Sequence, residues 1–343
     1  MRAVQVTSTG LVLQDVPVPE PGPGEVLVQV AGAGLCHSDC LIRDAPSVYR
    51  PDGAAFTLGH ETAGTVAAVG VGVQALSAGQ PVVVHSEYGC GQCGVCRSGH
   101  ERYCPAIAPC RGAGLGFDGG MAEYVLVPRA GAVVPLPEGI DPVDAGPLDD
   151  AGLTPYHAIR TSMPWLEAGA VAVVIGVGGL GHLAVQLLRV MTPATIVAVE
   201  PDEARRAFAL ELGADVALHP DDDAGARVKA MGVDGASLVL DLVGTDATLG
   251  LGVAAVATRG KVVCAGAGLG SHPFSMLTTP WECVLQTTYS GEAWELEQLL
   301  TLVATGAIRV RTHRITLDDV PGAYARLDRG EHGLGRLVAV PSP

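Results

Sequence analysis

Apolar and polar positions follow two different periods along this chain. Between residues 168 and 289, short apolar runs rich in β-branched residues alternate with stretches that have the spacing of amphipathic helices. The clearest helix is predicted at 202–212, and Gly213 provides its C-terminal cap. Six strands joined by helical crossovers are typical of a complete doubly wound parallel sheet. The strands are predicted near 171–175, 195–200, 215–218, 236–241, 261–265 and 286–289.

The parts of the chain on either side of this region are predicted to form a β-rich domain. Residues 1–35 contain a hairpin and a strand at 26–31, and the link between them has too many prolines for a central strand. After Trp294 the pattern predicts a helix at 295–305, a short strand, a helix after Asp319 and a final strand at 335–340. We expect this tail to complete the first domain rather than to form a third.

The glycines after the first strand of the alternating region predict a nucleotide-binding loop. The apolar run ends at Gly176, and helix-forming residues begin near Leu180. In such a unit Gly176 allows the tight turn, Gly178 lets the backbone approach a pyrophosphate, and Gly181 lets helix and strand pack closely. The helix N-terminus would then face the phosphates. The predicted loop comprises Gly176, Gly178, Gly179, Leu180 and Gly181.

The same stretch also has about the length of a membrane span, since no charged residue lies between Glu167 and Arg189. The glycines, His182, Gln186 and the change of period at the loop argue against this alternative. We therefore predict no membrane association.

An acidic residue at the end of the second strand indicates the cofactor. Glu200 follows the glycines by about 20 residues, where a carboxylate accepts hydrogen bonds from the adenosine ribose hydroxyls. Because a carboxylate repels a 2′-phosphate, we favour NAD over NADP. Arg205 and Arg206 are close enough to leave NADP open, and Glu200 could instead be an ordinary charge before a helix.

Two groups of residues have the chemistry of zinc ligands. Cys36 and His60 offer a thiolate and an imidazole, and a catalytic zinc takes three protein ligands and keeps one open position.

The stronger metal signal is a run of four cysteines. Cys90, Cys93, Cys96 and Cys104 are spaced to close a tetrahedral site, which would be structural because it has no open position. A redox pair lacks the flanking βαβ pattern here, and an iron–sulfur site remains open from the spacing alone.

Composition narrows the class of protein. The 343 residues are enough for two domains, and a net charge of −15 argues against nucleic-acid binding. The N-terminal sequence alternates like a strand rather than a signal peptide. Nine cysteines without an export signal favour metal ligation and free thiols, so we expect a cytoplasmic protein. We interpret four of them as free thiols: Cys40, Cys110, Cys264 and Cys283.

Together these motifs resemble zinc-dependent medium-chain alcohol dehydrogenases along essentially the whole chain. The resemblance is carried by Cys-His-Ser-Asp at 36–39, Gly-His-Glu at 59–61, the four-cysteine lobe, Gly-Gly-Met-Ala-Glu-Tyr at 119–124, Ala-Gly-Leu-Thr at 151–154 and the glycine loop. The run at 150–159 resembles actinobacterial NAD-dependent secondary alcohol dehydrogenases in particular.

The resemblance implies an α/β fold with two domains. Residues 1–150 and 291–343 would form a GroES-like β-rich catalytic domain, with a structural zinc lobe at about 88–106. Residues 151–290 would form a Rossmann NAD-binding domain with a doubly wound, six-stranded parallel sheet. We expect the active site in the cleft between the domains, at the carboxyl ends of the strands.

The third catalytic zinc ligand also follows from the resemblance. Many members carry a cysteine just before Ala-Gly-x-Thr, and here that position is Asp150, as the bacterial subgroup also has aspartate. Asp149 is one residue out of register. The alternative is that Asp150 only caps the helix that opens near Thr154.

The resemblance implies roles for several neighbours of the zinc. Ser38 would accept the proton of the alcohol and pass it to the cofactor ribose. Asp39 would hold the second nitrogen of His60, and Glu61 would approach the zinc as ligands exchange. Leu41 stands where many members end the proton relay with a histidine, so the proton must leave through water or another group. The implied cofactor contacts are His37, Thr154, Glu200, Arg205 and Arg336, and the expected pocket lining is Tyr49, Phe56, Trp281, Tyr289 and Ser290.

The implied reaction is reversible hydride transfer between an alcohol, expected to be secondary, and NAD, with one catalytic and one structural zinc per subunit. An alternative enzyme is a zinc-containing NAD(P)H reductase of activated C=C bonds or of aldehydes. An alternative from another class is a non-catalytic NAD-binding structural protein. We expect a small alcohol or ketone as substrate and a homodimer or homotetramer, with the strand near 286–289 at the subunit edge.

Overall fold

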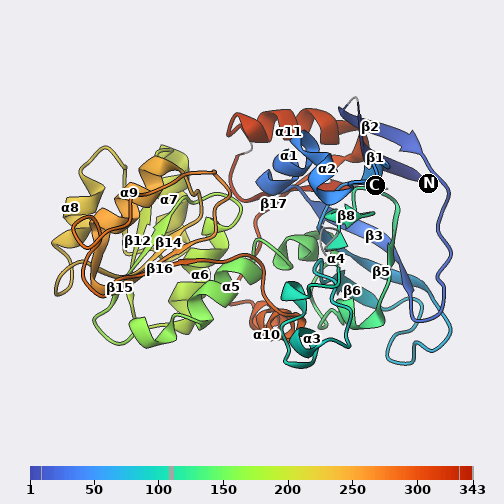
Figure 1. Cartoon of the computed structure of the whole chain (residues 1–343), viewed down its shortest axis with the longest axis horizontal. Helices are drawn as coiled ribbons and strands as arrows, with labels where there is room; N and C mark the ends of the chain where they lie inside the picture. Colours follow the sequence, from blue (N-terminus) through green and yellow to red (C-terminus); the bar gives the residue numbers. More distant parts are fainter. Residues whose placement is uncertain (9, 108–111, 332, 342–343) are drawn as a thin grey trace. The chain divides into compact units, whose positions relative to one another are not determined.

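The computed structural model describes residues 1–8, 10–107, 112–331 and 333–341. The chain of Figure 1 folds into two compact units. Each unit has its own apolar core. Unit 1 is Met1–Asp150, Gly291–Gly306 and Val310–Pro343, and unit 2 is Ala151–Ser290 with Ala307–Arg309. Cys110, interpreted above as a free thiol, lies outside the described residues.

Unit 2 is a doubly wound α/β unit. Its sheet has the order β13-β12-β11-β14-β15-β16 with every neighbouring pair parallel. The apolar run Val171–Ile175 forms β11 and is buried throughout, as expected of a parallel strand covered on both faces. The other strands are β12 (Thr195–Val199), β13 (Val216–Leu218), β14 (Ala236–Asp241), β15 (Val256–Cys264) and β16 (Val284–Thr287).

Helices cover both faces of this sheet. Helix α6 contacts α5 and α7, whereas α8 packs on α9, and Figure 1 shows α8 and α9 side by side. Right-handed crossovers put these two sets on opposite faces, because the strand order reverses after β13. The helices are α5 (Leu153–Arg160), α6 (Gly181–Met191), α7 (Glu203–Glu211), α8 (Ala224–Lys229) and α9 (Asp246–Ala255).

The charge-free stretch that has the length of a membrane span is β11, a loop and α6. Within the described ranges, no helix combines the length and the apolar character that crossing a bilayer requires.

Strand β15 starts at Val256, earlier than the predicted start near 261. Val256 pairs with Ala236, and the register then shifts before Lys261 pairs with Leu238. Arg259 has φ of 63°, in the left-handed region. Because of this irregularity, the first half of the strand lacks the regular pattern by which strands are predicted from a sequence.

Unit 1 is mostly antiparallel. In the part of the chain that the structure describes, one sheet has the order β10-β6-β5-β3-β18-β17 with β9 also paired to β3, a second has the order β2-β1-β4, and β7 pairs with β8. Strand β18 pairs with β3, so the C-terminal segment completes the sheet that the N-terminal segment begins. The strands are β1 (Arg2–Thr7), β2 (Gly10–Asp15), β3 (Val26–Gly34), β4 (Phe56–Thr57), β5 (Glu61–Val69), β6 (Pro81–Val84), β7 (Gly112–Ala113), β8 (Gly116–Phe117), β9 (Tyr124–Val127), β10 (Val133–Pro135), β17 (Thr312–Thr316) and β18 (Arg336–Val340).

The helices of unit 1 come from both ends of the chain. Figure 1 shows α1 (blue) beside α11 (red), and the two helices are in contact. The helices are α1 (His37–Asp44), α2 (Pro46–Tyr49), α3 (Gly94–Arg97), α4 (Pro142–Ala145), α10 (Ala293–Ala304) and α11 (Val320–Asp328), and the 3-10 turn η3 (Gly146–Leu148) follows α4.

Candidate functional site

Strand pairing in unit 1 brings the first group of candidate ligands together. Gly34 at the end of β3 pairs with Glu61 at the start of β5, and Cys36 and His60 lie just beyond these two ends. Asp150 reaches the same place from the turn after η3. One ligand atom from each of the four side chains, Cys36, His60, Glu61 and Asp150, lies within 4.8 Å of the others.

The two neighbouring aspartates, Asp149 and Asp150, have different partners in the structure. Asp149 is fully buried and is not among the four side chains of this group. Its Oδ1 lies 2.8 Å from His85 Nδ1, and its Oδ2 accepts a hydrogen bond of 2.8 Å from the backbone N–H of Ser86. Because both oxygens of Asp149 are engaged there, only Asp150 is available to a metal.

The distances around Asp150 suit a tetrahedral zinc ion. Zinc bonds of about 2.3 Å to sulfur and about 2.1 Å to nitrogen or oxygen put neighbouring ligand atoms about 3.4 to 3.6 Å apart. Asp150 Oδ2 lies 3.2 Å from Cys36 Sγ and 3.6 Å from His60 Nε2. No side chain caps the N-terminus of α5, so Asp150 does not play the alternative role of helix cap. The donor set therefore fits zinc with three protein ligands.

The ionisable groups around this centre favour a cation. Burial lowers the pKa of His60, but the Asp39 carboxylate and the hydrogen bond to Asp150 raise it well above its usual value. Burial would raise the pKa of Asp150, yet His60 and Arg336 hold it well below its usual range. Burial raises the pKa of Glu61 to about 7, against the effect of Arg336. A dication would satisfy the carboxylates and the thiol that meet here.

Asp39 and Ser38 lie next to the ligands. Asp39 Oδ1 is 2.9 Å from His60 Nδ1, which leaves Nε2 of the imidazole for a metal. The Ser38 hydroxyl donates to Cys36 Sγ over 3.1 Å and keeps some exposed surface. His37, at the start of α1, is exposed.

Arg336 is buried beside the ligand group. Its Nε donates to Glu61 Oε2 over 2.9 Å, its Nη2 donates to Glu61 Oε1, and Nη2 lies 3.4 Å from Asp150 Oδ2. The guanidinium therefore neutralises part of the negative charge at the centre. The predicted contact of Arg336 with a pyrophosphate stays a prediction.

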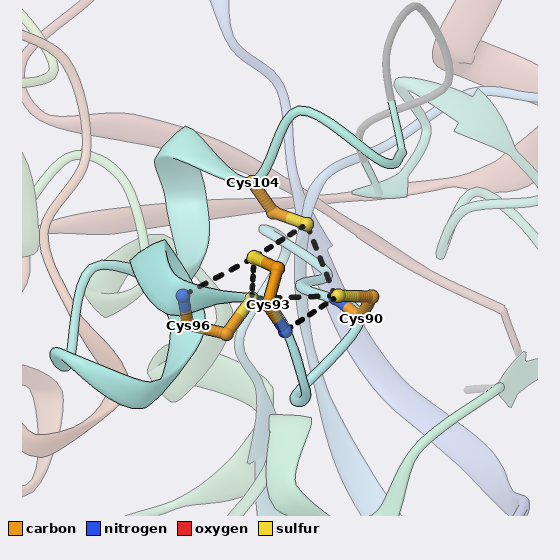
Figure 2. A group of neighbouring side chains, drawn as sticks. All are labelled: Cys90, Cys93, Cys96 and Cys104. Atoms are coloured by element: carbon orange, nitrogen blue, oxygen red, sulfur yellow. Dashed lines mark hydrogen bonds between the residues drawn. The ribbon is translucent and has the colours of Figure 1, made fainter.

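The four cysteines of the lobe converge on one point. Figure 2 shows the sulfur atoms of Cys90, Cys93, Cys96 and Cys104 turned toward one another. Neighbouring sulfurs lie 3.5 to 3.9 Å apart, and a tetrahedron with Zn–S bonds of about 2.3 Å has edges of about 3.8 Å. The arrangement fits a closed Cys₄ zinc site.

Backbone N–H groups support the sulfur atoms of this lobe. The N–H groups of Cys93, Cys96 and Cys90 donate to sulfur over 3.4 Å each. Such bonds lower the pKa of Cys90 to about 6, whereas burial raises the pKa of Cys96 to about 12. The lobe is held to its unit by Arg129, which donates to the carbonyl of Gly89 and lies 3.0 Å from Glu101.

The glycine loop of unit 2 has the backbone that its sequence predicts. Gly176 has φ of 88°, where a side chain is strained. A Cβ on Gly181 would lie 1.9 Å from the Gly176 carbonyl oxygen, so only glycine lets α6 approach β11 this closely. Gly178, Gly179 and Leu180 keep part of their surface exposed between strand and helix. The loop therefore offers free backbone to a phosphate.

Glu200 lies against this loop. Its carboxylate accepts hydrogen bonds from the backbone N–H of Val177 (2.7 Å) and of Asp202 (3.1 Å). Asp202, not Glu200, caps α7, with its side chain accepting from Arg205 N over 2.8 Å. Arg206 Nη1 donates to the carbonyls of Glu200 and Pro201. The alternative that Glu200 is merely a charge at the start of α7 is therefore not supported.

The residues expected to line the pocket have different surroundings. Phe56 has no exposed surface and packs in the core of unit 1, so we withdraw it from the pocket lining. Tyr49 is partly buried against the same core. In unit 2, Trp281 is 70% exposed and Tyr289 is 38% exposed, whereas Ser290 is buried.

Thr154, an expected cofactor contact, is buried in unit 2. Its Oγ1 accepts a hydrogen bond of 2.8 Å from the backbone N–H of Ser290.

Sequence reasoning missed two residues near the centre. Tyr324 donates to Asp39, and His85 holds Asp149. Tyr324 lies among the apolar positions of a helix and is therefore indistinguishable from a core residue in the sequence. The only signal for His85 is that it is the first polar residue after the apolar strand β6.

Two family models match this chain. Residues 22–138 match a model described as the alcohol dehydrogenase GroES-like domain, and residues 179–305 match one described as zinc-binding dehydrogenase.

Known proteins resemble the chain over nearly its full length. D-arabinose 1-dehydrogenase (NADP(+)) of Saccharolobus solfataricus is 35% identical, covering 97% of this chain and 95% of that protein. An NAD-dependent alcohol dehydrogenase of the same organism is 32% identical, covering 99% and 100%. The crystal structure of the alcohol dehydrogenase from Aeropyrum pernix matches with a TM-score of 0.91 at 33% identity, over 99% of this chain and 100% of that chain.

Proposed function

Because the chain belongs to the zinc-dependent medium-chain alcohol dehydrogenase family, we propose that it catalyses the reversible NAD-linked oxidation of secondary alcohols to ketones. The observation that carries the proposal is the ligand set Cys36, His60 and Asp150, which has the composition and spacing of a catalytic zinc site. The particular likeness to actinobacterial secondary alcohol dehydrogenases stays a prediction.

Two zinc ions per subunit belong to this proposal, one catalytic and one held by the four-cysteine lobe. The catalytic zinc, when bound, supplies a Lewis acid that makes the substrate hydroxyl more acidic. Cys36, His60 and Asp150 would hold it. Asp39 fixes the orientation of the His60 imidazole. Glu61 lies close enough to the three ligands to bind the zinc in place of one of them while substrate and product exchange.

Ser38 is the proposed acceptor of the substrate proton. Its hydroxyl lies 3.1 Å from the sulfur of the ligand Cys36 and is partly exposed, so a substrate hydroxyl at the centre would be within its reach. Ser38 would pass the proton to the cofactor ribose. Because Leu41 cannot carry the proton further, it would leave from there through water or another group.

NAD is the proposed hydride acceptor. Gly176 and Gly181 have the close packing expected of a pyrophosphate-binding loop, Gly178 between them is partly exposed, and the Glu200 carboxylate beside them would meet the adenosine ribose. A 2′-phosphate would face this negative charge. Arg206 of α7, which follows Glu200 in the sequence, is already engaged by the carbonyls of Glu200 and Pro201. These contacts favour NAD over NADP.

A cytoplasmic homodimer or homotetramer is part of the proposal. In the described sheet of unit 2, β16 is an edge strand paired only with β15. The segment before and within it exposes apolar side chains, which are Met276, Leu277, Trp281, Val284 and Leu285. An exposed apolar edge strand is best protected by pairing with a second copy.

The test is NADH formation by zinc-replete protein with NAD or NADP and a panel of substrates. The panel holds primary alcohols, secondary alcohols and aldoses, because one relative is named as an arabinose dehydrogenase. Turnover of secondary alcohols with NAD supports the proposal. Turnover confined to reduction of unsaturated aldehydes with NAD(P)H would favour the C=C reductase, and no turnover of any substrate would favour a non-catalytic protein.

A further inference from the structure

The Asp39 carboxylate has more partners than its contact with His60. It is fully buried, and its Oδ1 lies 2.9 Å from His60 Nδ1. Its Oδ2 accepts two hydrogen bonds, one from the backbone N–H of Cys36 (3.0 Å) and one from the hydroxyl of Tyr324 (2.7 Å). The two bonds to Oδ2 fix the plane of the carboxylate, and this plane directs Oδ1 at the imidazole.

Tyr324 comes from a segment far away in the sequence. It lies in α11, which contacts α1, the helix that Cys36 caps and that contains Asp39 (Figure 1). An ion pair of 2.9 Å between Arg43 Nη1 and Asp328 Oδ2 joins the same two helices. Tyr324 is 1% exposed, so its hydroxyl and the Asp39 carboxylate meet away from bulk water.

We propose that Tyr324 is a positioning residue of the catalytic centre, whose hydroxyl holds Asp39 and thereby the His60 imidazole in the orientation that binds zinc. The inference rests on the proposed function and deepens it. Losing an outer partner of a metal-binding histidine typically lowers metal affinity about 10- to 100-fold. Tyr324 contacts Asp39 and not His60 itself, and without its hydroxyl Asp39 Oδ2 still accepts a hydrogen bond from the Cys36 N–H. We therefore expect a loss of zinc affinity near the lower end of this range, about 10-fold.

Tyr88 provides a matched control. It is also a buried tyrosine in the core of unit 1, but its hydroxyl has no hydrogen-bond partner among the described residues. Tyr324→Phe and Tyr88→Phe remove the same atom from equally buried rings. Only the first variant removes a bond to the zinc-binding network.

The experiment measures zinc affinity by competition with a chromophoric chelator, and kcat and KM for an alcohol with NAD. Tyr324→Phe should lower the affinity of the catalytic zinc about 10-fold, lower kcat, and leave the four-cysteine zinc unchanged. Tyr88→Phe should match the native protein in each measurement. Equal zinc affinity in Tyr324→Phe and the native protein would overturn the inference, as would an equal loss in both variants.

A double-mutant cycle keeps the test valid if Tyr324→Phe also loses stability. If Tyr324 acts through Asp39, its replacement should change zinc affinity little once Asp39→Asn is present. Additive losses would overturn the inference. Zinc affinity does not depend on the substrate: if no alcohol is oxidised but the cycle is non-additive, the proposed function fails while the positioning role of Tyr324 stands.

Discussion

Replacing Gly34 by alanine should remove the catalytic zinc, because the added methyl group would collide with Glu61. Gly34 and Glu61 are directly paired between β3 and β5. A Cβ on Gly34 would lie 1.9 Å from Glu61 Oε2 and 3.0 Å from Glu61 Cβ, whereas ordinary contacts begin at 3.4 Å. Glu61 would have to leave its place and its hydrogen bonds to Arg336. Arg336 would then lose the partner that holds it beside Asp150.

The magnitude follows from these contacts. Overpacking typically costs about 1 to 3 kcal/mol, and each lost hydrogen bond between charged groups about 1.5 to 3 kcal/mol. With both bonds to Arg336 lost, we expect Gly34→Ala to lower the free energy of unfolding of unit 1 by about 4 to 9 kcal/mol. For a unit of this size the melting temperature should fall by about 8 to 36 °C.

The assay combines zinc content by mass spectrometry with thermal unfolding by calorimetry. Gly322→Ala is the matched control, because Gly322 lies in α11 with no atom within 4 Å of its added Cβ. The control should retain both zinc ions and gain about 0.5 to 1 kcal/mol, since alanine is the better helix former. If Gly34→Ala keeps two zinc ions and melts within about 2 °C of the native protein, the close packing of Gly34 on Glu61 is refuted.

Three further substitutions concern a buried ion pair, the four-cysteine lobe and the cofactor contact. Burial lowers the pKa of His85, but the Asp149 carboxylate raises it by more, so the pKa of His85 in the folded protein lies above its usual value. The pair therefore stabilises the fold fully below about pH 6.5, and this stabilisation is lost as the pH rises through the raised pKa of His85. His85→Gln should therefore cost about 1 to 3 kcal/mol at pH 6 and less at pH 9 in urea titrations, and an equal cost at both pH values would contradict this. Cys104→Ser should remove one zinc ion and increase hydrogen exchange in residues 89–107 while the catalytic zinc stays bound; loss of both ions would show that the two sites are not independent. Glu200→Ala should raise the KM for NAD about 10-fold, since it removes a hydrogen bond to a charged group, and should reduce the preference for NAD over NADP. An unchanged preference would mean that the carboxylate does not select the cofactor.

The sequence predicts those parts of the molecule that depend on local pattern. The buried run Val171–Ile175 and the glycines after it define β11 and its loop, because a parallel strand covered on both faces is apolar throughout. The spacing of the four cysteines from Cys90 to Cys104 likewise predicts their meeting, since short loops bring them together.

Other features depend on contacts between distant segments and leave no local pattern. Tyr324 donates to Asp39 across 285 positions of sequence, and Phe56 enters the core although it lies in a short stretch between two glycines, Gly53 and Gly59. Arg336 follows a glycine at the start of β18, yet its partner Glu61 is 275 positions away. The choice between Asp149 and Asp150 came from resemblance, and the structure supplies its physical reason, the bonds from His85 and Ser86.

NAD-linked alcohol oxidation by this protein should require the zinc ion that Cys36, His60 and Asp150 hold. The decisive experiment measures zinc content and NADH formation from a secondary alcohol in the native protein and in Asp150→Ala, with Asp149→Asn as the neighbouring control. We expect two zinc ions and turnover in the native protein and in the control, and one zinc ion without turnover in Asp150→Ala. If Asp150→Ala keeps two zinc ions and full turnover, Asp150 is not a ligand of a required zinc.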